Sequence, residues 1–210
     1  MSTMIEDFGA RVASVWEGMR STTRSLIVGA LQSSSAGAGG AGATRNGSPY
    51  DARADWELSR LLAALDERAT EEGASLNAEQ ARELRRMAET CAVVLQHQTQ
   101  SAEVFAQLVE RAFGLHDYAR IDALADALAA RFAPSEVCEL ARSPHVVVRA
   151  LAQESLAQSP TNVLIGLLAD PVDSDVARDA LERQAEDYGS EQARQIVHLL
   201  NQADMAEDDA

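Results

Sequence analysis

The stretch SPHVVVRALAQESLAQSP, residues 143–160, decides the fold class of this chain. It begins with three valines, as a β-strand would, and continues with alanine, leucine and glutamine, which favour helix. Its apolar residues recur at steps of three and four, which is the spacing of one helix face. Ser143 followed by Pro144 is a typical helix start, because proline at the first helical position loses no hydrogen bond. We therefore predict a helix here.

The same spacing extends over residues 51–203, and no segment alternates at period two over a useful length. The sequence therefore predicts an all-α fold. Further helix starts are predicted at Ala133-Pro134 and Ser159-Pro160, and Asp173 or Ser174 is predicted to cap another helix. Three arginines recur every 29 residues, each near the start of the longer helix of a predicted pair: Arg120, Arg149 and Arg178. A fixed period of this size indicates a helical solenoid, in which each pair stacks on its neighbours.

Two segments, LARSPHVVVRALAQESLA (140–157) and LLADPVDSDVARDALERQA (167–185), resemble HEAT-like (armadillo-type) repeats of the short bacterial kind. In that pattern an LL-x-D ending is followed by a turn with proline and then by a Val-Arg helix start. The matching positions here are Leu167, Leu168, Asp170, Pro171, Val176 and Arg178, and in the earlier segment Leu140, Ser143, Pro144, Val148 and Arg149. Ser143 replaces the expected Asp, and Ala177 intervenes between Val176 and Arg178. The resemblance covers about residues 117–202.

This resemblance implies a HEAT-like α-solenoid, that is, a helical-repeat superhelix. It also implies a structural role, the bracing of neighbouring repeats, for the turn aspartate and the helix arginines: Asp170, Arg120, Arg149 and Arg178. Proteins of the HEAT-like class are mostly scaffolds and binding modules, and a minority are enzymes or enzyme subunits. The resemblance therefore favours an interaction protein.

Residues 1–32 are predicted to form a separate amphipathic helix, followed by a flexible Gly/Ala/Ser linker over residues 33–50. Six apolar side chains fall within one arc of the helix: Ile5, Phe8, Val12, Val15, Trp16 and Met19. One interpretation is that this helix folds back and covers an end of the solenoid. The other is that the six residues are anchors that dock into a groove of a partner protein. The sequence leaves both open.

The charge of the chain limits the partners that we expect. Its formal net charge is −15, and all 18 basic residues are arginine, so chemistry that needs a lysine nucleophile is excluded. Nucleic acid and anionic lipid would repel such a chain, which argues against both as partners. No apolar run is long enough to span a membrane, and no signal peptide is recognisable, so we expect a cytoplasmic protein. Residues 204–210 are predicted to be a disordered acidic tail.

No motif predicts a catalytic, cofactor-binding or metal-binding residue. Cys91 and Cys138 are predicted to be buried thiols, and the four histidines lack metal-ligand spacing. The function predicted from the sequence is a non-enzymatic protein–protein interaction module, with an acidic solenoid surface and a tethered docking helix. The alternative is a small enzyme or lyase-type chaperone with a ligand pocket in the concave face. The identity of the protein partner and the oligomeric state remain open.

Overall fold

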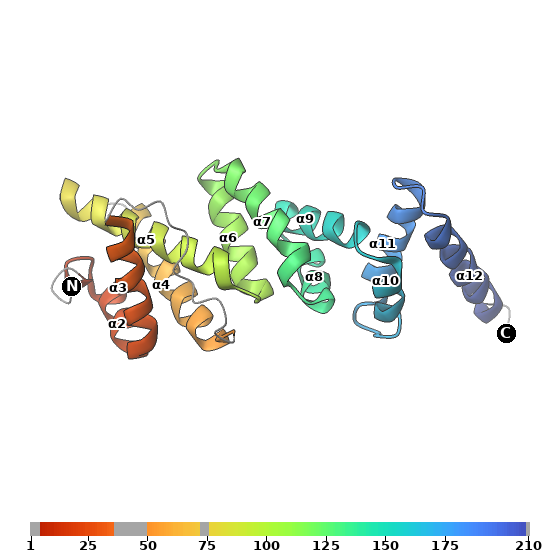
Figure 1. The fold of residues 1–210 in the computed structure, drawn as a ribbon, viewed down its shortest axis with the longest axis horizontal. Helices are drawn as coiled ribbons and strands as arrows, with labels where there is room; N and C mark the ends of the chain where they lie inside the picture. The colour runs from red at the N-terminus through yellow and green to blue at the C-terminus, as the bar shows by residue number, and fades with distance from the viewer. Residues whose placement is uncertain (1–4, 36–49, 72–75, 209–210) are drawn as a thin grey trace. The chain divides into compact units, whose positions relative to one another are not determined.

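Every regular element in the described part of the chain is an α-helix, which confirms the all-α prediction (Figure 1). The structure is a computed structural model that describes residues 5–35, 50–71 and 76–208. The chain divides into two compact units, residues 1–104 and residues 105–210, which we call unit 1 and unit 2.

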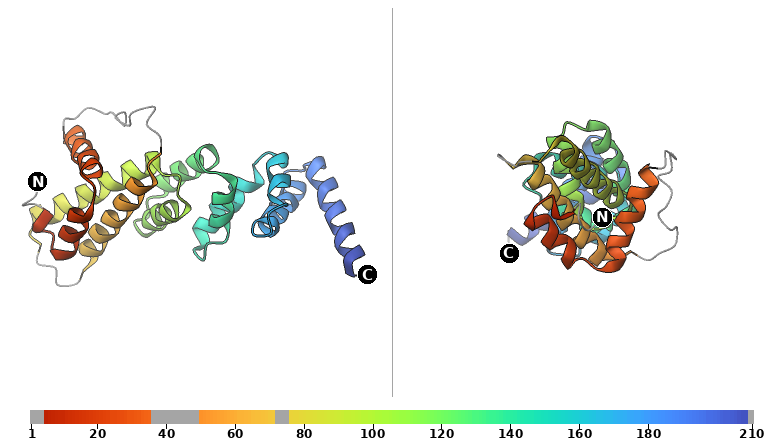
Figure 2. Two further views of the ribbon diagram at one scale, coloured as in Figure 1. Left: turned by 90° about the horizontal axis from the view of Figure 1, so that it is seen from below. Right: turned by 90° about the vertical axis from the view of Figure 1, so that its left-hand side faces the viewer.

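Unit 1 is built on two long helices, α4 (Ala52–Thr70) and α5 (Ala78–Gln98), which pack against each other. Local hydrogen bonds at their starts explain where they begin. The carboxylate of Asp51 accepts the first backbone N–H groups of α4, and Asn77 and Gln80 form a reciprocal capping box at α5. Two further helices, α2 (Ala10–Gly18) and α3 (Ser21–Ser35), cover this pair: α2 packs on α4, and α3 packs on α5 and α4 (Figure 2).

The prediction of one helix over residues 1–32 is wrong, because the segment is broken between α2 and α3. Met19 has an extended backbone, and the N–H of Arg20 donates to the carboxylate of Glu57 at 3.2 Å in place of a helical partner. The break also changes the direction of the chain, so that Ile27 and Leu31 reach the core although they are out of phase with the earlier apolar arc. The predicted linker is shorter at its start, because α3 continues through residue 35. The rest of it, residues 36–49, lies outside the described residues.

Unit 2 continues from within α6 as a succession of helices: α6 (Ala102–Gly114), α7 (Tyr118–Arg131), α8 (Pro134–Ala141), α9 (Val146–Ala157), α10 (Thr161–Leu167), α11 (Ser174–Glu186) and α12 (Glu191–Asp208). The stretch that decides the fold class is a helix, as predicted, but it starts at Val146 instead of Pro144. Residues 143–145 form a turn, in which the hydroxyl of Ser143 accepts the N–H of His145 and the carbonyl of Ser143 accepts the guanidinium of Arg149 at 2.7 Å.

The longer helices of unit 2 pack in series, α7 on α9 and α9 on α11 (Figure 1). The shorter α8 packs on α9, and α10 packs on α11. The first residues of α7, α9 and α11 are 28 positions apart: Tyr118, Val146 and Ser174. Buried leucines fill the spaces between them, and small residues such as Ala152 and Ala177 let the helices approach closely.

The prediction of a disordered tail is wrong for residues 204–208, which belong to α12. The carboxylate of Asp204 forms an ion pair with Arg178 of α11 at 2.6 Å, which fixes this last part of α12 to the neighbouring helix. Alanine, methionine and glutamate in this segment also favour helix. Residues 209–210 lie outside the described part.

Candidate functional site

The four residues predicted to brace neighbouring repeats make contacts of two kinds. Arg178 of α11 reaches α12, where it binds Asp204 and the side-chain oxygen of Asn201 at 2.5 Å. The other three residues form bonds close to their own positions in the chain. Arg149 binds the carbonyls of its own turn, Asp170 accepts the N–H of Val172, and Arg120 pairs with Asp117 at 3.3 Å.

Other residues link helices that are about 30 positions apart in the sequence, and the sequence analysis missed them. The guanidinium of Arg142, at the end of α8, binds Asp173 at 2.9 Å and the carbonyl of Val172 at 3.0 Å. Asp173 was predicted to cap α11, but its carboxylate makes no capping bond and points to this arginine instead. Arg183 donates to Gln153 at 3.2 Å in the same way, from α11 to α9. Their partners are 31 and 30 positions apart, so the repeat period was the signal that could have found them.

The six predicted docking anchors lie against the chain itself. Ile5, Phe8, Val12, Trp16 and Met19 are buried in unit 1, and Val15 is half-buried. On the outer side of α2, Arg11 forms an ion pair with Glu67 of α4 at 2.5 Å. A partner could use this apolar face only if α2 left α4.

A buried carboxylate, that of Glu57 in α4, holds the α2–α3 junction. Its side chain is 3% exposed and accepts three kinds of donor: the Thr23 hydroxyl at 2.5 Å, the Arg20 side chain at 3.1 Å and Arg53 at 3.2 Å. Burial alone would raise the pKa of Glu57, but the hydrogen bonds from Thr23 and Arg20 outweigh it and lower the pKa. Glu57 is therefore held ionised as a structural latch. A proton-transfer role would need a carboxylate with open acceptor positions.

A second buried carboxylate lies two residues earlier on the same helix. Asp55 accepts the hydroxyl of Tyr50 at 2.9 Å and the amide of Gln98 from α5 at 3.3 Å. Burial and this carboxylate together raise the pKa of Tyr50 to about 12, so the phenol stays protonated and keeps donating. Neither carboxylate was predicted, because an acidic residue on a helix is usually solvated.

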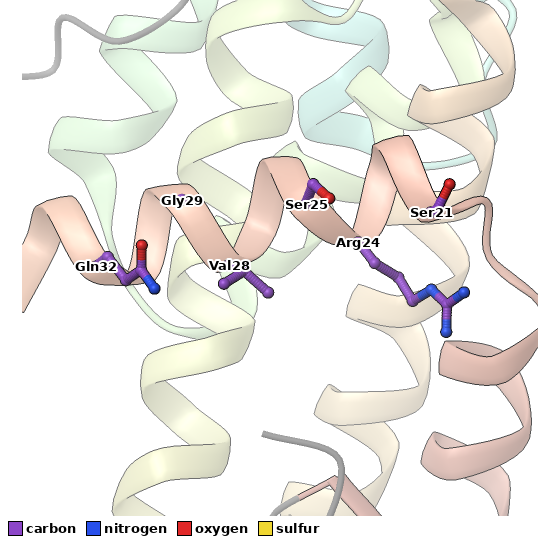
Figure 3. Close-up of a pocket in the computed structure, with 6 residues that line it drawn as sticks. All are labelled: Ser21, Arg24, Ser25, Val28, Gly29 and Gln32. Carbon is purple, nitrogen blue, oxygen red and sulfur yellow. The ribbon is translucent and has the colours of Figure 1, made fainter.

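Two hollows on the described chain offer little enclosed space. One of 360 Å³ lies on α3, and all its lining residues come from one face of that helix, so no opposing wall is formed (Figure 3): Ser21, Arg24, Ser25, Val28, Gly29 and Gln32. Another of 40 Å³ lies between α9 and α11 and has room for about one water molecule. The described residues also contain no group of three or more His, Cys, Asp and Glu side chains suited to a metal ion. Burial raises the pKa of the Cys138 thiol to about 11, which leaves it protonated.

Exposed apolar side chains gather at the turns of unit 2. We call four of them the turn row: Leu115, Tyr118, Val146 and Val172. They stand in the turns before α7, α9 and α11 or at the first positions of these helices, and each is more than half exposed. The end of α6 also contacts the turn before α9, since the rings of Phe113 and His145 meet edge to face with centroids 5.6 Å apart. The exposed apolar residues therefore recur at every second turn of unit 2, before α7, α9 and α11.

Carboxylates recur farther along the same three helices. We call Asp126, Glu154 and Glu182 the carboxylate row, since each is the ninth residue of α7, α9 or α11 and they are 28 positions apart. The hydroxyl of Tyr188 and the amide of Gln158 donate to Glu154 and lower its pKa, so it is ionised at neutral pH. Unit 2 as a whole has 19 Asp and Glu against 8 Arg, a formal charge of −11, whereas unit 1 has 14 against 10, a charge of −4. Most of the negative charge is therefore in unit 2.

Comparisons of this chain with models of known protein families, with curated proteins and with solved structures gave no significant match. Among the residues that the structure describes, every helix is too short or too polar to cross a bilayer.

Proposed function

We propose that this chain is a non-enzymatic protein–protein interaction module in which unit 2 carries the binding surface. The turn row supports this proposal most directly, because Leu115, Tyr118, Val146 and Val172 expose apolar area that a stable fold has no need to expose. The recurrence of this exposure at every second turn, before α7, α9 and α11, distinguishes it from the scattered apolar residues found on most protein surfaces. Function in this proposal is recognition, with no chemical step.

We further propose that unit 2 is a HEAT-like solenoid. Three features support it: helices that pack in series, helix starts 28 positions apart, and polar links between residues about one repeat apart. In such a stack each helix pair contacts only its neighbours, and one side of every pair stays available to a partner. The longer helices α7, α9 and α11 would then form the binding side.

The N-terminal segment has a different role in this proposal. The burial of Phe8, Val12 and Trp16, together with the latch at Glu57, supports a covering element for unit 1 in preference to a tethered docking helix. The predicted recognition of a partner by residues 1–32 is therefore replaced by recognition through unit 2.

Site-specific photo-crosslinking in native lysate tests the proposal. A photo-reactive benzoylphenylalanine is placed at Leu115, Val146 or Val172, and in matched controls at Leu199 of α12 or Leu26 of α3, which are also exposed. We expect one and the same crosslinked protein from all three row positions and none from the controls. Equal crosslinking from Leu199 or Leu26, or no product from the row, would contradict the proposed surface.

A further inference from the structure

We infer that the surface of unit 2 recognises a cationic amphipathic helix of a partner protein, with the partner's apolar side chains on the turn row and its Lys or Arg side chains on the carboxylate row. This inference rests on the proposed function, and it adds the chemistry and the geometry of the partner. Two independent features support this inference: the exposed apolar residues of the turn row and the negative charge of the carboxylate row.

The distance between the two rows fits a helix. From Val146 to Glu154 there are eight residues of α9, which is about 12 Å along its axis at the usual rise per residue. An α-helix with its side chains is about 10–12 Å wide. A helix lying across α7, α9 and α11 therefore reaches the turn row with one side and the carboxylate row with the other.

The length of the surface sets the length of the partner helix. The three helices α7, α9 and α11 pack in series, and packed helices are about 8–10 Å apart, so the rows extend over about 20 Å. This corresponds to about four helical turns. An amphipathic segment of that length presents apolar anchors and charges on opposite sides, which is a common mode of peptide recognition.

Charge selects a cationic helix over an acidic one. Asp122 and Asp126 of α7 make no ion pair or side-chain hydrogen bond with other described residues, so their charges are available to a partner. Two arginines of the binding side are already paired: Arg149 with carbonyl oxygens of its own turn, and Arg178 with Asp204 and Asn201 of α12 and with Glu182 of the carboxylate row at 3.5 Å. Arg183 is the exposed exception, and it donates to Gln153. The charge of −11 on unit 2 also disfavours a second copy of the chain as occupant, because like charges would meet.

Binding of two synthetic helices to the full-length protein, followed by fluorescence anisotropy, tests the inference. One is a labelled Leu/Lys amphipathic helix of about four turns, and the other is the same helix with Glu in place of Lys. We expect the Leu/Lys helix to bind, with affinity that falls as salt is added, and the Leu/Glu helix to bind at least about tenfold more weakly.

Matched variants locate the binding. We expect Asp122→Asn with Asp126→Asn to weaken binding of the Leu/Lys helix about three- to tenfold, as removal of exposed charge pairs does. The control is Glu110→Gln with Glu139→Gln, which removes the same charge from exposed positions on α6 and α8 and is expected to change the affinity less than about twofold. Leu115→Ser with Val146→Ser is expected to weaken it about tenfold, and Leu199→Ser on α12 to leave it unchanged. Leu115 and Val146 are 61% exposed and Leu199 is 62% exposed, so folding is disturbed little in each case.

Each other result overturns the inference in a distinct way. Equal losses from both carboxylate pairs would mean general attraction to an acidic protein. The Leu/Glu helix could bind tightly and lose this binding in the variant Leu115→Ser with Val146→Ser. This result would support the docking surface but would contradict a cationic partner. If neither helix binds while the turn row still gives photo-crosslinks, the proposed function stands and the inference fails. A doubled mass in sedimentation that is lost in the same variant would assign the turn row to a second copy.

Discussion

In unit 1, two acidic side chains of α4, Glu57 and Asp55, are buried and accept hydrogen bonds from neighbouring segments. In unit 2, by contrast, ion pairs link one helix to another, as Arg142 does with Asp173 and Arg178 with Asp204. The first arrangement is closed, because the buried carboxylates need the N-terminal segment and α5 to satisfy them. The second is open-ended, because each link joins only two helices, α8 to the start of α11 or α11 to α12. The two units of one chain are therefore stabilised by polar contacts of different kinds.

The two units also differ in whether their large apolar side chains are buried or exposed. Unit 1 buries the anchors of its amphipathic N-terminal segment, among them Phe8 and Trp16, against its own helices. Unit 2 leaves Tyr118 and Val146 exposed at the ends of helices whose middles are well packed. The pattern that looked most like a binding element in the sequence is thus part of a core, and the exposed apolar surface lies at turns, where no helical periodicity marks it.

The largest effect on stability is expected from cavities in the cores of the two units, and it tests whether the units unfold independently. Leu156 in α9 and Leu61 in α4 are both fully buried, so each substitution by Ala should lower the free energy of unfolding by about 3 kcal/mol. In native-state hydrogen exchange, we expect Leu156→Ala to reduce protection in α7, α9 and α11 and to spare α4 and α5. Leu61→Ala should do the reverse. Equal loss of protection across both units from either variant would show that they unfold as one and that the division has no energetic meaning.

The sequence alone predicted the helical class and the positions of most helices, because steps of three and four depend only on local geometry. It placed the helix with Val148 correctly even though three valines in a row favour a strand. It failed at Met19, because the break there depends on a bond from the Arg20 N–H to Glu57, which is 37 residues away. It also failed at residues 204–208, where the ion pair of Asp204 with Arg178 holds a polar segment in helix.

The candidate site was harder to predict than the fold. The carboxylate row follows the repeat period and could have been found from it, since Asp126, Glu154 and Glu182 are evenly spaced. The turn row could not, because exposure of Leu115 or Val172 depends on which neighbours cover the turn in space. Buried Glu57 was equally hidden, since an acidic residue on a helix is usually solvated. The bracing role of Arg120, Arg149, Asp170 and Arg178 stays a prediction.

A smaller effect, specific to unit 1, is expected from loss of the latch. Glu57→Ala removes the acceptor for the Thr23 hydroxyl and the Arg20 guanidinium, and we expect the free energy of unfolding to fall by about 2 kcal/mol. Protection should be lost first in α3, at the junction with α2. The control is Glu67→Ala, whose ion pair with Arg11 is more than half exposed on both sides and should contribute little.

The pH dependence of stability gives a second measurement of the same latch. The pKa of Glu57 is lowered in the folded protein, so its contribution is fully present above the pKa of an unfolded glutamate, about 4.5, and is lost as pH falls through the lower folded value. In urea titrations from pH 7 to acid, we expect Glu57→Gln to lose less stability than the wild type over this range. Parallel pH profiles for the two proteins would show that Glu57 is not held ionised by its neighbours.

The smallest effect is expected from the link between α8 and α11. Asp173 is nearly buried and Arg142 is partly exposed, so their pairing should contribute about 1 kcal/mol, which a double-mutant cycle of Arg142→Ala and Asp173→Ala measures as coupling in urea unfolding. The matched pair is Arg194 with Glu191, which is exposed and three residues apart on one helix, and its coupling should be much weaker. A coupling near zero for Arg142 and Asp173 would mean that the stack of unit 2 depends on apolar packing alone. In that case the two units would differ only in which side chains they bury, and the polar links between helices of unit 2 would not contribute to its stability.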